Sequence, residues 1–144
     1  MWYNTLVNLF LRTPLHGVIS SGIMSLTYTG RKSGRSYTIP VNYVPLPDNP
    51  DVLLTTSLRK RVWWRNLRDG APVTLRLRGR KVSATATAIE EETAVADLLV
   101  PYLTRMSNIA DQFDVGLDEE GIPRRADTAV AAQTRVIIRT VLDE

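Results

Sequence analysis

Along most of the chain, hydrophobic and polar residues alternate with the period of two that is typical of half-buried strands. The alternation is clear where Tyr37, Ile39 and Val41 lie on one face of a segment and polar residues lie on the other. Pro40 lacks the N–H that a sheet ladder needs, so we expect it at a bulge or an edge. The pattern predicts strands at residues 23–29, 35–44, 51–57, 73–78, 82–88 and 135–142. The fourth and fifth of these form a hairpin around Gly79-Arg80.

Other segments show helical or irregular patterns. Residues 2–11 predict an amphipathic helix packed on the sheet, with contact to a membrane surface as the alternative. Residues 62–67 predict a short helix, and residues 90–106 predict a longer one with acidic residues in its first turn. Residues 107–125 are rich in loops. We therefore expect one domain over residues 1–144 with a mainly β (α+β) fold: a six-stranded antiparallel barrel with an N-terminal helix and one or two further helices.

The composition excludes several kinds of active site. The chain of 144 residues contains no cysteine, which excludes disulfides, thiolate nucleophiles and cysteine metal ligands. His16 is the only histidine, so a histidine metal cluster is excluded and no metal is expected. The acids at residues 90–92 are explained by the start of a helix. No catalytic side chain is identified, yet such a protein can be an enzyme if a bound cofactor carries the reaction.

Basic residues are concentrated in one part of the chain, although the net charge is only +3. Asp69 is the only acid in the segment 59–81. The basic residues of that segment are Arg59, Lys60, Arg61, Arg65, Arg68, Arg76, Arg78, Arg80 and Lys81. Such asymmetry indicates an anionic partner: a phosphorylated cofactor, an anionic membrane or nucleic acid. Nucleic acid is not expected, because the overall charge is low.

Residues 29–35, with the sequence Thr-Gly-Arg-Lys-Ser-Gly-Arg, combine two glycines with basic side chains. Gly30 and Gly34 allow a sharp turn that aims backbone N–H groups at an anion. Arg31 and Lys32 add positive charge, and an arginine can bind a phosphate through two hydrogen bonds. The segment is not a P-loop, because its Lys-Ser pair follows an arginine rather than a glycine. From the residues alone it is either an anion site or a solvated turn.

The order of the motifs resembles the deazaflavin-dependent nitroreductase family, which shares the flavin-reductase-like split β-barrel of the pyridoxamine-phosphate oxidases. Thr-Gly-Arg-Lys-Ser-Gly is followed by Pro-Val-Asn-Tyr, by Thr-Thr-Ser and by Trp-Trp-Arg-Asn-Leu. The resemblance runs from Leu26 to Ala88, with a weaker echo at Thr134-Arg135. It implies a split barrel that transfers a hydride between the deazaflavin coenzyme F420 and a small-molecule substrate, namely a nitro compound, a quinone or an enone.

The resemblance also implies which residues bind the coenzyme. The turn would hold the phosphate, and residues 37–41 and the backbone of residues 56–58 would lie against the ring. Val62, Trp63, Trp64 and Asn66 would close over the ring or over the acidic tail. One of the two tryptophans would pack in the core and the other would line the pocket. The basic cluster at 59–61 would bind the acidic tail. The coenzyme-binding residues expected on this basis are Arg31, Lys32, Ser33, Gly34, Tyr37, Pro40, Val41, Thr56, Ser57, Leu58, Arg59, Lys60, Trp63, Trp64 and Asn66.

Two features depart from the family pattern. The connection between Ser57 and Trp63 is shorter than in the nitroreductases. Those proteins also place tyrosines shortly before the final Thr-Arg pair, one of them a proposed proton donor, where this chain has Ala-Val-Ala-Ala-Gln. Tyr43 and Tyr102 are the candidates to replace it, and neither is preferred. The sequence therefore predicts an enzyme that draws its proton from water.

Several alternatives remain open from the sequence. FMN is the nearest alternative cofactor, and a non-catalytic carrier of flavin or haem with the same fold is an alternative from another class. A homodimer is expected by analogy with the family. The N-terminus lacks the pattern of a signal peptide, and its apolar stretch is too short to cross a bilayer. We therefore expect a cytoplasmic protein, with membrane association through the N-terminal helix as the alternative.

Overall fold

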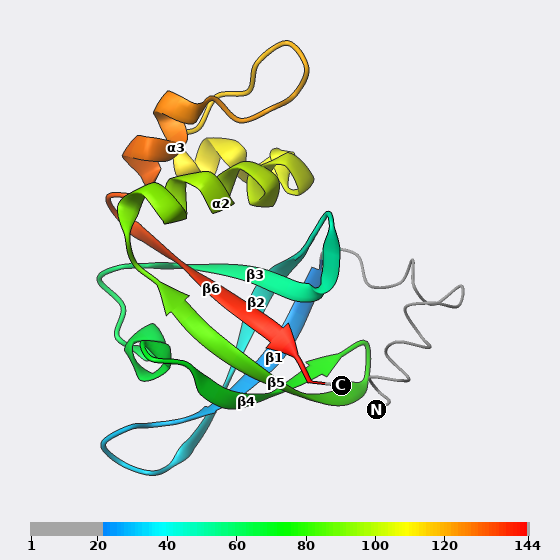
Figure 1. The fold of residues 1–144 in the computed structure, drawn as a ribbon, viewed down its shortest axis with the longest axis vertical. Helices are drawn as coiled ribbons and strands as arrows, with labels where there is room; N and C mark the ends of the chain where they lie inside the picture. The colour runs from blue at the N-terminus through cyan, green and yellow to red at the C-terminus, as the bar shows by residue number, and fades with distance from the viewer. Residues whose placement is uncertain (1–21, 144) are drawn as a thin grey trace.

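The computed structural model describes residues 22–143, and its six strands form one closed antiparallel barrel in the order β1-β2-β3-β6-β5-β4 (Figure 1). The predicted six-stranded antiparallel barrel is therefore confirmed. The predicted N-terminal helix at residues 2–11 and His16 lie outside the described residues. The elements, of which η3 and η4 are 3-10 helices, are β1 (Gly22–Thr29), β2 (Ser36–Leu46), β3 (Asn49–Leu58), η3 (Trp63–Leu67), β4 (Ala71–Leu77), β5 (Arg80–Ile89), α2 (Glu92–Arg105), η4 (Ser107–Phe113), α3 (Arg125–Ala131) and β6 (Arg135–Leu142).

The hairpin of β4 and β5 shows how the alternating pattern builds the barrel interior. Val73 and Leu75 of β4 are buried in the barrel core, and β5 opposes them with Ala84 and Val82. The connection is the residue pair Arg78-Gly79, both with positive φ, at 49° and 81°. A two-residue loop of this kind matches the twist of the flanking strands. The hairpin is thus where the pattern predicts it, with its turn one residue earlier.

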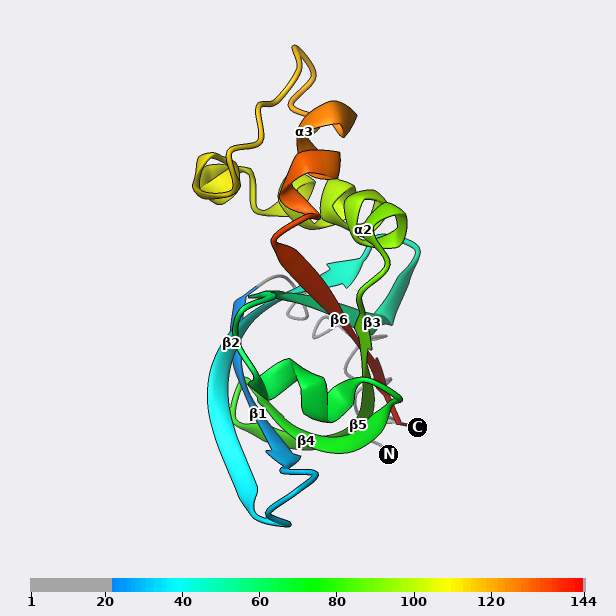
Figure 2. The same cartoon turned by 90° about the vertical axis from the view of Figure 1, so that its left-hand side faces the viewer.

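The 3-10 helix η3 covers one mouth of the barrel, as the view in Figure 2 shows. Trp64 and Leu67 are buried and belong to the hydrophobic cluster that fills the barrel. The indole N–H of Trp64 donates to the carbonyl oxygen of Leu58 at 3.2 Å, which ties η3 to the end of β3. The short helix predicted over residues 62–67 is confirmed, in 3-10 form.

The ladder between β2 and β3 is open along the first part of β2. The two strands pair only from Val44 onward, while the preceding residues of β2 pair with β1 alone. Where the strands part, the hydroxyl of Thr55 donates to the carbonyl oxygen of Asn42 at 2.9 Å. Pro40 lies on the open stretch, opposite Ser25 of β1. It therefore occupies the edge position expected of a residue without a ladder donor.

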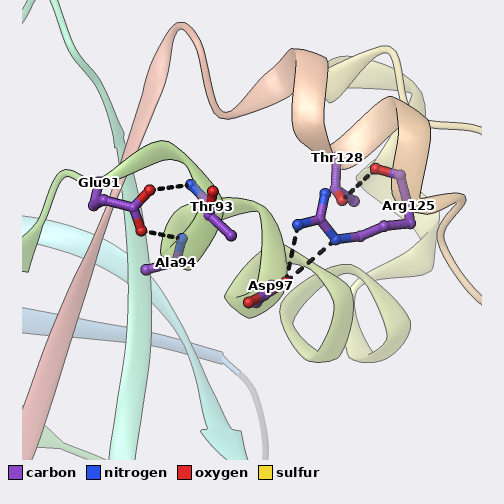
Figure 3. Close-up of polar contacts among 6 residues, drawn as sticks. All are labelled: Glu91, Thr93, Ala94, Asp97, Arg125 and Thr128. Atoms are coloured by element: carbon purple, nitrogen blue, oxygen red, sulfur yellow. Dashed lines mark hydrogen bonds and ion pairs between the residues drawn. The ribbon is translucent and has the colours of Figure 1, made fainter.

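A second hydrophobic core lies between the barrel wall and the helices α2 and α3, which Figure 1 shows packed at one end of the barrel. Glu91 caps α2: its carboxylate accepts hydrogen bonds from the N–H groups of Thr93 and Ala94 at 2.9 and 3.0 Å (Figure 3). These bonds lower the pKa of Glu91. An exposed ion pair between Arg125 and Asp97, 3.0 Å long, joins α3 to α2.

The segment that was expected to be rich in loops is more ordered than its sequence suggests. It contains η4 and an isolated bridge between Leu117 and Pro123, and the helix α3 that follows was not predicted. No helix within residues 22–143 combines the length and the apolar character needed to cross a membrane. The predicted homodimer and the membrane contact stay predictions.

Candidate functional site

The glycine-containing turn between β1 and β2 is closed by its own backbone. The N–H of Gly30 donates to the carbonyl oxygen of Arg35 at 2.8 Å, and the N–H of Gly34 donates to that of Gly30 at 2.9 Å. A Cβ atom at residue 30 would lie 2.7 Å from the hydroxyl of Ser33 and 2.9 Å from the ring of Tyr37. The turn therefore needs glycine at residue 30 because the chain folds back on itself there.

Asn66 of η3 joins this turn to the end of the barrel. Its side-chain oxygen accepts a hydrogen bond from the N–H of Arg31 at 2.8 Å, and its side-chain nitrogen donates to the carbonyl oxygen of Trp63 at 2.9 Å. The guanidinium of Arg31 donates to the carbonyl oxygen of Arg65 at 2.8 Å. Two motifs far apart in the sequence are thus held against each other by side-chain amide and guanidinium groups.

A basic cavity of about 640 Å³ lies between the turn and η3. Its walls include Arg31, Lys32 and Arg65, none of which forms an ion pair within residues 22–143. Arg68 also lines the cavity, and its charge is compensated by Glu90 at 2.8 Å. In the described part of the chain, no hydrogen bond occupies the backbone N–H groups of Lys32 and Ser33. Cationic side chains and free backbone N–H groups are the donors with which proteins bind phosphate and carboxylate groups.

A second cavity of about 500 Å³, here called the cleft, occupies the gap between β2 and β3. One wall comes from residues 39–42 of β2 and the other from residues 56–58 of β3. Trp63 lines both cavities, and its indole N–H donates to the hydroxyl of Ser57 at 3.1 Å. Its ring also lies 6.0 Å from that of Tyr28. The two cavities are therefore neighbours that share one fixed aromatic wall.

Tyr102 of α2 and Arg135 of β6 also line the cleft. Burial raises the pKa of Tyr102, whereas a hydrogen bond with Thr56 and the charge of Arg135 lower it to a smaller extent. Burial likewise lowers the pKa of Arg135, opposed by Tyr102 and Asp114. The guanidinium of Arg135 lies over the ring of Phe113, 3.8 Å from its centroid. A phenol and a cation thus face the same space.

The structure brings most of the predicted coenzyme-binding residues to these two cavities. Those lining the basic cavity are Arg31, Lys32, Ser33, Tyr37, Trp63 and Asn66. Those lining the cleft are Pro40, Val41, Thr56, Ser57, Leu58 and, again, Trp63. Gly34 shapes the turn with a φ of 71°, and Trp64 is the tryptophan that packs in the core. The chain order of the motifs alone does not show that two cavities meet at Trp63.

Arg59 and Lys60, expected to bind an acidic tail, line neither cavity. The guanidinium of Arg59 donates to the carbonyl oxygens of Ala132 and Glu90, and its backbone N–H donates to that of Thr134. Arg59 therefore connects the end of β3 with the segments that flank β5 and β6. The positive charge of the cavity comes instead from the turn and from η3.

Sequence reasoning missed several residues of the cleft. Asn42 and Arg135 line it, and Arg61, expected at the acidic tail, lines it as well. The Thr-Arg pair at residues 134–135 was noticed only as an echo of the family, without a role. Tyr102 was named as a candidate proton donor alongside Tyr43, but only Tyr102 lines a cavity.

Comparison with models of protein families shows to which family the chain belongs. A family described as F420H2-dependent quinone reductase matches residues 13–123. The chain belongs to this family. The predicted relation to F420-dependent oxidoreductases is thereby confirmed, and the enzymes of this family use coenzyme F420. Reduction of a nitro compound stays a prediction. No curated protein sequence matches the chain.

Solved structures share the fold. A protein of unknown function from Agrobacterium tumefaciens is 16% identical, with a TM-score of 0.54, over 88% of this chain and 51% of its own. An FAD and heme binding protein from Mycobacterium smegmatis is 15% identical, with a TM-score of 0.53, over 88% of this chain and 63% of its own. An F420 reductase aligns at 20% identity and a TM-score of 0.46, over 85% of this chain and 86% of its own. The chain thus spans between half and two thirds of the length of the first two structures.

Proposed function

We propose that this F420H2-dependent quinone reductase family member binds coenzyme F420 across both cavities and passes a hydride from its reduced form to a quinone or an enone. The observation that supports the proposal is the shared wall of Trp63, which lines both the basic cavity beside the turn and the cleft between β2 and β3. A long cofactor with an anionic tail and a flat ring needs such a pair of sites. The volumes of about 640 and 500 Å³ lie within the usual range for small-molecule pockets.

The basic cavity fits the phosphate and the carboxylates of the coenzyme tail. Arg31 and Lys32 supply charge from the turn, and Arg65 supplies it from η3. The open N–H groups of Lys32 and Ser33 add uncharged donors to the same wall. Charge-assisted hydrogen bonds of this kind contribute about 1.5–3 kcal/mol each. In this arrangement Arg59 has no part in binding, because backbone carbonyls already occupy its guanidinium.

The cleft fits the ring and the acceptor. Pro40 and Val41 offer an apolar wall from β2, and the backbone at Ser57 and Leu58 faces them across the gap. When bound, the reduced coenzyme supplies the hydride. The protein orients the coenzyme. Trp63, whose indole N–H donates a hydrogen bond to Ser57, would lie between the tail and the ring of the bound coenzyme.

Anaerobic oxidation of reduced F420 by a quinone tests the proposal. We expect turnover with menadione and with an enone, monitored by the loss of absorbance of the reduced coenzyme. Little turnover should occur when reduced FMN replaces reduced F420. The Arg31→Ala/Lys32→Ala double variant should raise the KM for the coenzyme strongly, whereas Lys81→Ala, on the β4–β5 hairpin away from both cavities, should not. Turnover with reduced FMN only, or binding of F420 without any turnover, would favour the FMN enzyme or the carrier instead.

A further inference from the structure

The cleft carries polar groups that binding of the coenzyme tail does not use. Tyr102 comes from α2, Thr56 from β3 and Arg135 from β6, and all three line the cleft. Tyr102 is only 1% exposed, so its hydroxyl is directed by packing rather than by water. Thr56 lowers the pKa of Tyr102, against the larger effect of burial, and it lines the same cleft. Because α2 packs against β3 and β6 beside the cleft, the Tyr102 side chain has little freedom to move.

Arg135 is a half-buried cation that forms no ion pair in the part of the chain that the structure describes. Within residues 22–143 its guanidinium forms neither a hydrogen bond nor an ion pair with another side chain. The ring of Phe113 lies against the guanidinium, and the Arg135 side chain also lines the cleft. A guanidinium carries five N–H donors in a fixed fork, and leaving such donors without acceptors in a partly desolvated place is costly. The arrangement indicates that an oxygen atom of a ligand accepts a hydrogen bond from the guanidinium of Arg135.

We propose that Tyr102 and Arg135 bind the carbonyl oxygen of the acceptor, with Arg135 stabilising the negative charge that develops there and Tyr102 donating the proton. This assignment rests on the proposed function, because it needs a hydride donor in the same cleft. It differs from the sequence expectation, which left the proton to water. It also narrows the substrate class to compounds whose reducible unit ends in a carbonyl oxygen, such as quinones and enones.

The proposed step balances. The acceptor gains a hydride with both electrons from the reduced coenzyme, and the carbonyl oxygen becomes an oxyanion. The O–H bond of Tyr102 breaks, a new O–H bond forms on the acceptor, and the phenolate regains a proton from water. Arg135 keeps its proton throughout and lowers the energy of both anions. The charged groups facing this oxygen are Arg135 and Arg61 from the cleft wall, with Asp114 near Arg135.

The variant Tyr102→Phe tests the proton donor, and Tyr43→Phe is its matched control. Tyr43 is also 1% exposed and its pKa is also raised by burial, yet it lines neither cavity. We expect Tyr102→Phe to lower kcat with menadione about 100-fold or more, as the loss of a general acid does. The Kd for F420 and the melting temperature should stay near the wild-type values, and Tyr43→Phe should keep kcat. A Tyr102→Phe enzyme with kcat within threefold of the wild type would overturn the assignment.

A second measurement needs neither coenzyme nor turnover. The anion of 4-nitrophenol resembles the oxyanion of a reduced acceptor, and its binding is visible from its absorbance. We expect the wild type to bind this anion about 10- to 100-fold more tightly than the Arg135→Gln variant does, because that variant loses a charged hydrogen bond. Lys81→Ala, which lies away from both cavities, should bind it as the wild type does. Equal affinity of the wild type and Arg135→Gln would refute the anion site. If the wild type oxidised no reduced F420, the proposed function would fail, and the titration would still decide the role of Arg135.

Discussion

Asn66 offers the sharpest test of how the two motifs are held together. The variant Asn66→Ala removes both of its hydrogen bonds, to the N–H of Arg31 and to the carbonyl oxygen of Trp63. With about 0.5–1.5 kcal/mol for each bond, the free energy of unfolding should fall by about 1–3 kcal/mol. The turn should also lose its fixed position against η3. We therefore expect the Kd for F420 to rise about tenfold.

The near-isosteric variant Asn66→Asp separates charge from geometry. It keeps an acceptor for the N–H of Arg31, but it places a carboxylate against the carbonyl oxygen of Trp63 and inside the basic cavity. At an effective dielectric constant of about 20, two charges about 6 Å apart interact by about 3 kcal/mol. Against an anionic tail this raises Kd about 100-fold at low salt, more than Asn66→Ala does. High salt should reduce the difference between the two variants.

Fluorescence titration with F420, together with thermal unfolding, measures these effects. Asn49→Ala is the control, because it also removes a hydrogen bond that a backbone N–H donates to an asparagine side chain, at the start of β3 and away from both cavities. Its Kd should match the wild type. If Asn66→Asp bound F420 as tightly as the wild type while unfolding at a lower temperature, Asn66 would be a structural residue only. The basic cavity would then not be the tail site.

The remaining predictions concern residues that stabilise the fold around the two cavities. Arg59→Ala should lower the melting temperature, because each hydrogen bond to a charged group contributes about 1.5–3 kcal/mol, and it should leave the Kd for F420 unchanged. Lys60→Ala should change neither the melting temperature nor the Kd. Gly30→Ala should raise that Kd, because its Cβ collides with side chains of the turn. Gly34→Ala meets no neighbouring atom, but the φ of 71° at residue 34 strains any residue other than glycine, so it should raise that Kd as well. The pKa of Glu91 is lowered on folding, so its stabilisation is present above the pKa of the unfolded chain and is lost as pH falls. Glu91→Gln should therefore unfold at a lower temperature than the wild type at neutral pH and at the same temperature in acid.

Much of the barrel follows from local patterns. The alternation in β4 and β5 specifies which side chains face inward, and Arg78-Gly79 supplies the positive φ angles that the hairpin turn needs. Both features are contained in neighbouring residues, so the sequence predicts them directly. The turn of residues 29–35 is local in the same sense. Its role becomes visible only in the structure, because Asn66 and Arg65 reach it from a distant segment.

Other features depend on contacts that no local pattern reveals. Arg59 was expected at the tail site because of its charge, but its acceptors are backbone carbonyls of Glu90 and Ala132, far along the chain. Tyr102 looks like a core residue of an amphipathic helix, and it becomes part of a cavity because β2 and β3 separate beside it. The helix α3 is too short to show a strong period, and it is stabilised by packing against α2.

Parallel titration of the purified protein with F420 and with FMN tests the central claim most directly. The account predicts that F420 binds in a single site, and that removal of its glutamate tail weakens binding strongly at low salt and less at high salt, because Arg31, Lys32 and Arg65 hold the carboxylates. FMN should bind more weakly than F420. Tighter binding of FMN, or equal affinity for F420 with and without its tail at low salt, would contradict the account.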